Sequence, residues 1–170
     1  MALVWREQMS VGNNIIDTEH RYLIDQINAV ELALNSTENH DMLVETLNHL
    51  VEYTKTHFDH EEQIQLKFKF PDHEKHKKQH LRIMTELYSI KQKLDKILGT
   101  DQTAAGEENQ SEEVTDSELN MLLEDDIVNS ADEKDLAPLV ALMRSWILDH
   151  MLGTDLTMKP YLKKMSPDFN

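Results

Sequence analysis

The chain has 170 residues, of which 39% are hydrophobic and 29% charged, and this size and composition fit one domain with one core. Only four glycines and four prolines occur, and long stretches rich in Leu, Glu, Lys, Met and Gln favour helices over sheets. The net charge of −15 argues against nucleic acid as a partner, because its phosphates would be repelled, and the absence of cysteine excludes disulfides and thiolate metal sites.

Four helices are predicted from apolar residues that recur every three or four positions. Their expected ranges, after an irregular arm at residues 1–16, are 17–35, 41–68, 72–98 and 135–162. The first of the three helices within residues 17–98 is expected to begin at Asp17 as its N-cap. Pro71 separates the second helix from the third, because proline disfavours helix in the residue before it. The predicted inward faces include Leu32 in the first helix and Leu81 in the third.

A long acidic insertion separates the third and fourth predicted helices at residues 100–134. Positions 101–136 hold thirteen acidic residues and one lysine, so this segment accounts for −12 of the net charge and leaves −3 for the rest. Such a composition is typical of a solvated, disordered loop. Apolar residues at helical spacing within residues 117–128 favour a second interpretation, in which a short helix docks on the bundle or on a protein partner.

The sequence contains no feature that predicts a membrane protein. No apolar run approaches the ~20 residues that a membrane-spanning helix needs. Residues 1–7 lack the long apolar core of a secretory signal. We therefore expect a cytoplasmic protein that does not insert into membranes.

The mostly short connections predict an all-α protein, a single domain over residues 1–170 folded as an up-down-up-down antiparallel four-helix bundle. In antiparallel neighbours, side chains meet when they lie equally far from the turn that joins their helices. His20 lies about 18 residues before the first turn and His57 about 19 residues after it, so both are ~27–29 Å from that turn. The same comparison at the other turns gives a layer of seven potential metal ligands: His20, His57, Glu61, His76, His80, His150 and Asp155.

The composition of this layer indicates metal binding. Imidazole and carboxylate groups together suit iron, zinc, manganese or copper, and five histidines with two carboxylates suit two ions better than one. A bundle without metal would leave seven polar side chains at matched depth unexplained, and burying them unpaired would be costly. A ferritin-like di-iron enzyme would need two Glu-x-x-His motifs, whereas the nearest motif is Asp17-x-x-His20. A zinc protease would need His-Glu-x-x-His, and His73-Glu74-Lys75-His76 is one residue short.

The candidate ligands stand in short motifs, in the order Asp17-x-x-His20, His57-Phe58-x-x-Glu61-Glu62, Phe70-Pro71, His76-x-x-x-His80 and His150-x-x-x-x-Asp155. This pattern resembles the ligand pattern of the hemerythrin family, in particular the single-domain bacterial hemerythrins. The resemblance covers about residues 1–99 and 135–165, and all seven ligands appear in order with matching spacings. It implies a protein with two non-haem irons that binds dioxygen reversibly, for oxygen binding, storage or delivery, and that is not an enzyme.

By position, the resemblance implies three groups of ligands: His76, His80 and His150 for one iron, His20 and His57 for the other, and Glu61 and Asp155 as bridges. Five imidazoles, two bridging carboxylates and a bridging oxo or hydroxo group would fill all but one position around two six-coordinate irons. A dry pocket would keep water and anions from that open position, and its expected walls are Leu23, Trp146, Ile147 and Leu148. Many family members have an aromatic residue three positions past the last aspartate, where this chain has Met158.

Two other functions are compatible with a di-iron site. An oxygen or redox sensor would use the acidic insertion as its output. An oxidase, peroxidase or nitric-oxide activity is the third interpretation, after dioxygen binding and sensing.

Overall fold

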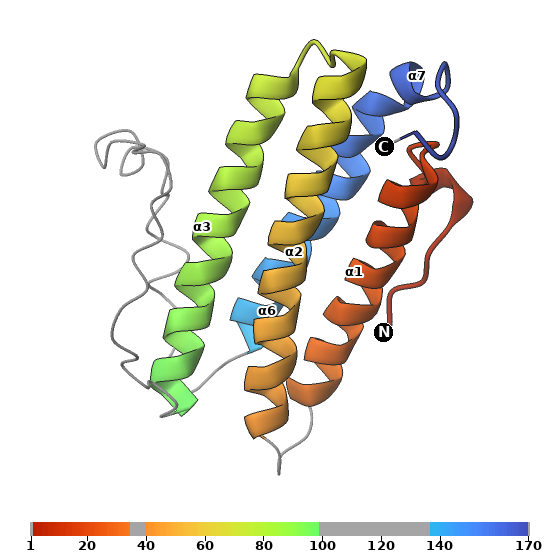
Figure 1. Ribbon diagram of the computed structural model, residues 1–170. Coiled ribbons are helices and arrows are strands. Elements are labelled where there is room, and N and C mark those ends of the chain that lie inside the picture. The colour runs from red at the N-terminus through yellow and green to blue at the C-terminus, as the bar shows by residue number, and fades with distance from the viewer. Residues whose placement is uncertain (1, 35–39, 99–136, 170) are drawn as a thin grey trace.

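The computed structural model describes residues 2–34, 40–98 and 137–169, and every regular element within them is a helix. The three long helices are α1 (Asn14–Leu34), α2 (His40–Phe68) and α3 (His73–Leu98). A fourth rod begins with α6 (Ala137–Asp149). Figure 1 shows the four rods side by side; α1 packs on α2, α2 on α3, and α6 on both α3 and α1. The prediction of an all-α protein is confirmed for the described residues.

Several sequence-based predictions concern residues outside the described ranges. These are the acidic insertion at residues 100–134, the short helix within residues 117–128, and the first turn near residue 38. None of the helices in the described part of the chain combines the length and the apolar character that crossing a bilayer requires.

The helix α1 begins three residues earlier than predicted, at Asn14. The side-chain oxygen of Asn13 accepts a hydrogen bond from the backbone N–H of Ile16 (3.1 Å), so Asn13 is the N-cap. Asp17 instead lies in the first turn, where its carboxylate accepts hydrogen bonds from the backbone N–H of Val11 (2.8 Å) and from the Ser10 hydroxyl (2.6 Å). The predicted cap therefore fastens the N-terminal arm to the bundle.

The fourth rod is not the continuous α-helix that was predicted over residues 135–162. After α6 come the π-helical turn η2 (His150–Thr154), the 3-10 turn η3 (Asp155–Met158) and the short helix α7 (Lys159–Leu162). The backbone N–H of Asp155 donates to the carbonyl of His150, five residues earlier. In an α-helix, residues five apart diverge by about 140°. The wider π-turn brings His150 and Asp155 to the same side of the rod.

The polar ligand candidates lie between two apolar clusters. The larger cluster fills most of the bundle, and the smaller lies at the end where α2 meets α3. On each rod, the candidates stand between a residue of the smaller cluster and one of the larger: Ile16 and Leu23 on α1, Ile64 and Val51 on α2, Phe70 and Ile83 around the start of α3, and Met158 and Ile147 on the fourth rod. Apolar packing on both sides therefore isolates the polar layer from water.

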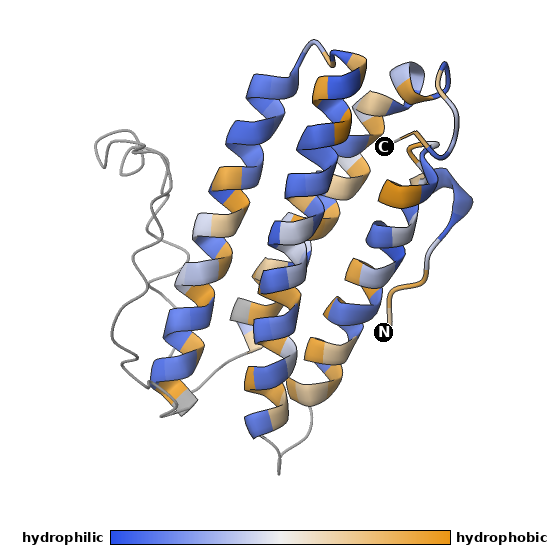
Figure 2. Ribbon diagram, in the orientation of Figure 1, coloured by the Kyte–Doolittle hydropathy of each residue, from blue (hydrophilic) through white to orange (hydrophobic). Residues whose placement is uncertain are grey.

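Two residues predicted to face inward are exposed. Leu32 on α1 is 71% exposed and Leu81 on α3 is 43% exposed. On α3 the inward position belongs to Ile83, which is 7% exposed. Figure 2 shows that α3 is hydrophilic over its first turns, and its first apolar residue is Leu81, so the apolar pattern there is too sparse to fix the inward face.

Candidate metal centre

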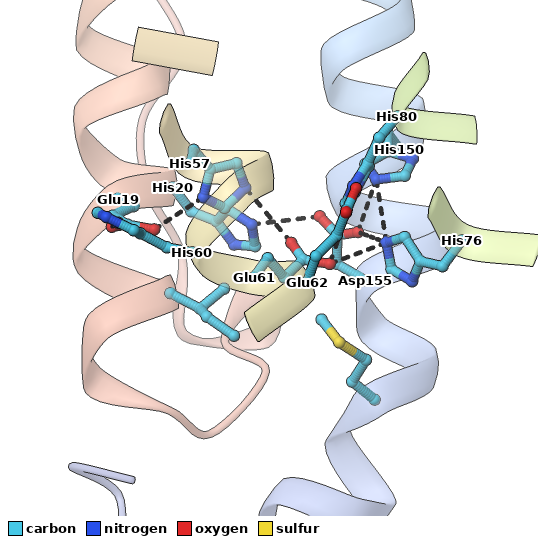
Figure 3. A network of polar contacts seen from close by, with 12 residues as sticks. Glu19, His20, His57, His60, Glu61, Glu62, His76, His80, His150 and Asp155 are labelled. Atoms are coloured by element: carbon cyan, nitrogen blue, oxygen red, sulfur yellow. Dashed lines mark hydrogen bonds and ion pairs between the residues drawn. The ribbon is translucent and has the colours of Figure 1, made fainter. Parts of the chain in front are cut away.

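The seven side chains predicted from the sequence converge, and each is at most 5% exposed. They form two groups whose potential ligand atoms lie within 4.8 Å of one another. We call the groups the three-histidine set (Glu61, His76, His80, His150 and Asp155) and the two-histidine set (His20, His57, Glu61 and Asp155). Both carboxylates belong to both sets, and Figure 3 shows them between the two groups of imidazoles.

In the three-histidine set, α3 and the π-turn η2 point their imidazoles at the same carboxylate oxygens. His76 Nε2 lies 2.8 Å from Glu61 Oε1 and 3.0 Å from Asp155 Oδ1. His150 Nε2 also lies 3.0 Å from Asp155 Oδ1, and it is 3.1 Å from His76 Nε2. His80 Nε2 lies 3.7 Å from Glu61 Oε1. Three imidazole nitrogens and two carboxylate oxygens therefore face a common point.

In the two-histidine set, α1 and α2 supply one imidazole each. His20 Nε2 lies 3.2 Å from Asp155 Oδ2, and His57 Nε2 lies 3.4 Å from Glu61 Oε2. The two rings meet edge to face with their centroids 4.8 Å apart. This set uses the carboxylate oxygens that the three-histidine set does not contact. Glu61 and Asp155 thus each present one oxygen to the three-histidine set and the other oxygen to the two-histidine set.

Many polar atoms at this centre have no hydrogen-bond partner among the described residues, although they are buried. The unpaired atoms that face a carboxylate or an imidazole of the centre are Nε2 of His20, His57 and His80, Oε2 of Glu61 and Oδ2 of Asp155. Buried polar atoms without partners are costly and uncommon. A cation in each set would supply the missing partner, because imidazole nitrogen and carboxylate oxygen are both good ligands for transition metals. The residues present therefore fit a pair of metal ions.

Without a cation, the centre holds an uneven distribution of protons. Burial disfavours the charged form of His76, but its hydrogen bonds to Asp155 and Glu61 outweigh burial and raise the pKa of His76 to about 9. Burial lowers the pKa of His80 to about 3, and the nearby His150 and His76 contribute to this shift. Burial would raise the pKa of Asp155, but its contacts with histidines, His150 first, hold that pKa well below its usual value. A metal ion must displace the proton from His76 in order to bind there.

Two glutamates hold imidazoles of the two sets in place, a role that their positions in the sequence did not predict. His57 Nδ1–H donates to Glu19 Oε2 (2.9 Å), and His80 Nδ1–H donates to Glu62 Oε1 (2.9 Å). Because each Nδ1 carries the proton, each Nε2 is free to bind a metal. Glu19 also contacts His60, whose side chain is 49% exposed. The position of Glu19 directly before His20 was the available signal, but its partner lies on another helix.

The ring of Phe58 stacks on a ligand imidazole. Its centroid is 3.9 Å from that of His80, and the two planes are inclined by 7°. The edge of His150 also meets the Phe58 ring, at 5.4 Å between centroids. Phe58 is 4% exposed, so it closes the larger apolar cluster against the three-histidine set.

Of the predicted pocket walls, the structure buries two completely. Leu23 and Ile147 are 1% and 2% exposed and belong to the larger apolar cluster. Trp146 is partly buried against the same cluster, and Leu148 is half-buried. Met158, which stands where many members of the resembled family have an aromatic residue, is fully buried in the smaller cluster. These placements are compatible with a dry pocket, and the oxygen-binding role of the four residues stays a prediction.

Comparisons with known proteins agree with this geometry. The Hemerythrin HHE cation binding domain family matches residues 11–162. The chain is similar to the bacteriohemerythrin of Stenotrophomonas maltophilia (strain R551-3), with 31% identity over 78 residues, 46% of this chain and 50% of that protein. Its identity to the bacteriohemerythrins of Pseudomonas paraeruginosa (strain DSM 24068 / PA7) and Pseudomonas aeruginosa (strain LESB58) is 32% over 78 residues, with the same coverage. The matched stretch spans about half the length of these curated relatives.

Proposed function

The chain belongs to the hemerythrin family, and we propose that it is a non-haem di-iron protein that binds dioxygen reversibly, for oxygen binding, storage or delivery. One observation carries the proposal. Glu61 and Asp155 each present one oxygen to a set of three histidines and the other oxygen to a set of two. Carboxylates placed in this way are suited to bridging two cations held at unequal sites. The name of the relatives, bacteriohemerythrin, supports the same conclusion.

The proposed ligands follow from the two sets. His76, His80 and His150 would hold one iron, His20 and His57 would hold the other, and both ions would share Glu61 and Asp155; the proposed cofactor includes a bridging oxo or hydroxo group. When bound, the irons supply the electrons with which dioxygen is held reversibly. The chain supplies five donor groups to the three-histidine set and four to the two-histidine set. The protein therefore leaves more room for a small external ligand at the two-histidine set.

The surrounding side chains have two proposed tasks, which are to orient the ligands and to exclude water. Glu19 and Glu62 keep the protons of His57 and His80 on Nδ1, away from the metal side. Leu23, Trp146, Ile147 and Leu148 are the proposed walls of the oxygen pocket. An apolar wall disfavours water and anions at the open position, because neither finds a hydrogen-bond partner there. No residue of the chain is assigned as a catalytic acid or base.

The proposal includes the predictions that reach beyond the described residues. We propose a single domain with an up-down-up-down antiparallel topology, interrupted by the acidic insertion at residues 100–134. We also propose that the protein is cytoplasmic, that it binds neither nucleic acid nor membranes, and that residues 117–128 offer a surface to a protein partner.

The experiment is a visible spectrum of the anaerobically reduced protein before and after air is admitted, with iron counted by elemental analysis. We expect about two irons per chain, since there are two sets of donors. Air should produce a visible absorption band that disappears when oxygen is removed. A single iron per chain would contradict the proposal. Rapid loss of the band with release of peroxide would favour an oxidase or peroxidase instead.

A further inference from the structure

Gln65 is a fully buried amide next to a proposed bridging carboxylate, and the proposed function does not yet use it. Gln65 is 0% exposed and lies on α2, one turn after Glu61. Its Nε2 donates to Glu61 Oε1 at 2.8 Å and lies 3.3 Å from Met158 Sδ. Its Oε1 lies 3.0 Å from His73 Nδ1, at the start of α3. Three different elements therefore hold this one side chain.

The orientation of the Gln65 amide follows from hydrogen-bond chemistry. An ionised carboxylate only accepts hydrogen bonds, so the NH₂ group and not the oxygen must face Glu61. The amide oxygen then faces His73, whose Nδ1–H must be the donor. Each polar atom of Gln65 has a partner, so turning the amide would break the contacts with Glu61, Met158 and His73 together.

We propose that Gln65 is a positioning residue that keeps Glu61 extended between the two sets, an inference that rests on the proposed di-metal site. The amide fixes Oε1, the oxygen that faces His76 and His80. With Oε1 fixed, Oε2 is left pointing toward His57 in the two-histidine set. Without the amide, the Glu61 carboxylate can rotate and bring both oxygens to the three-histidine set.

Loss of the Gln65 amide should therefore affect metal binding at the two sets unequally. Gln65 contacts the oxygen on the three-histidine side, yet its loss should mainly weaken the other side. The two-histidine set has only two imidazoles and one oxygen from each carboxylate. Losing the Glu61 oxygen would leave it with Asp155 as its sole carboxylate. The three-histidine set would keep all its imidazoles and could gain an oxygen.

The test is a Co²⁺ titration of the metal-free protein, followed by visible absorption and by calorimetry, which report the two binding steps separately. Gln65→Met has a similar length and volume but no N–H donor. We expect the first step, at the three-histidine set, to keep its wild-type affinity. The second step, at the two-histidine set, should weaken about 10-fold, the low end of the range for groups that orient metal ligands. Gln63→Met is the matched control, because Gln63 is an exposed glutamine on the same helix, and it should leave both steps unchanged.

A second variant tests the contact between His73 and the amide oxygen of Gln65. His73→Phe removes the donor to the Gln65 oxygen and leaves Glu61 and Gln65 in place. It should weaken the second Co²⁺ step by less than Gln65→Met does. The double variant should be no weaker than Gln65→Met alone, because His73 acts only through Gln65. This prediction can be checked with His73→Phe even where Gln65→Met does not fold.

The outcomes separate this inference from the proposed function. If the wild-type protein binds fewer than two Co²⁺ ions, the di-metal site is wrong and the role of Gln65 falls with it. If the wild type binds two ions and Gln65→Met leaves both steps unchanged, weakens both equally or weakens only the first, the positioning role is wrong and the di-metal site stands. A general destabilisation of the fold would lower both Co²⁺ affinities. A selective loss of affinity in the second step therefore reports the positioning role of Gln65.

Discussion

The two sets of ligands differ by one imidazole, although they share both carboxylates. The three-histidine set takes two histidines from α3 and one from η2, whereas the two-histidine set takes one each from α1 and α2. Each set has one histidine whose Nδ1 is held by a glutamate. The two sets are therefore similar in the glutamates that orient their histidines, but they differ in the number of donor groups. The asymmetry of the centre therefore resides in the number of donors, and we propose the two-histidine set as the side that takes an external ligand.

Removing the metal should have the largest effect on the free energy of unfolding, because both sets then lose their bound ions. The metal-free centre keeps buried histidines and carboxylates with unpaired atoms. At a metal concentration 1,000-fold above the dissociation constant, one bound ion adds about 4 kcal/mol to the free energy of unfolding. For a chain of this size that corresponds to a melting temperature higher by roughly 8–16 °C. Calorimetric scans with and without a chelator at pH 7 measure it, and coincident melting curves would show that the centre binds no metal.

Removing a shared carboxylate should damage both sets together. Asp155→Ala takes one oxygen from each set, so both steps of metal binding should weaken by about 100-fold or more, beyond the usual effect of losing an orienting group. Stepwise Co²⁺ titration measures the two affinities. Asp149→Ala is a suitable control, because Asp149 is exposed on the same rod. If only one step weakened in Asp155→Ala, Asp155 would not be a bridge.

Removing one imidazole should affect one set. His20→Ala leaves the two-histidine set with a single histidine, while the three-histidine set keeps all its donors. We expect the metal content to fall from about two ions per chain to about one, as measured by elemental analysis after dialysis. His49→Ala, at an exposed histidine, should keep the wild-type content. Complete loss of metal in His20→Ala would mean that the two sets fill only together.

The smallest effects should come from the orienting glutamates, and they should sharpen the comparison. Glu19→Ala releases His57 in the two-histidine set, and Glu62→Ala releases His80 in the other. Each should weaken its own step of metal binding by about 10-fold and leave the other step nearly unchanged. Comparing the two titration curves measures this. If the variants were indistinguishable, the glutamates would serve the fold and not the individual sets.

The sequence predicted the helices and the convergence of the seven side chains because both follow from spacing along rigid rods. His20 and His57 lie on different helices, but equal distances from a turn place them at the same depth. That they bind iron remains a prediction. The prediction of a continuous fourth helix was wrong, because apolar periodicity does not distinguish an α-turn from a π-turn. The separation of five residues between His150 and Asp155 was the signal, since an α-helix would turn them apart.

Gln65 could not be recognised from the sequence. A glutamine four residues after a glutamate is usually part of an exposed helical pair, and the nearby Gln63 is itself exposed. Its burial results from Met158 and His73, which other elements bring against it. Glu19 is similar, because its role depends on a rotamer and on a partner 38 residues away. Contacts between side chains on different elements decide these roles, and local patterns do not contain them.

The π-turn at residues 150–154 also bears on any attempt to graft this centre onto another scaffold. A designed bundle of ideal α-helices offers attachment points three, four or seven residues apart, and none of these reproduces the pair His150 and Asp155. Copying the seven side chains onto straight helices would misdirect one donor by about 140°. The acceptor scaffold must therefore include one over-wide turn in its last helix, placed at the level of the metals.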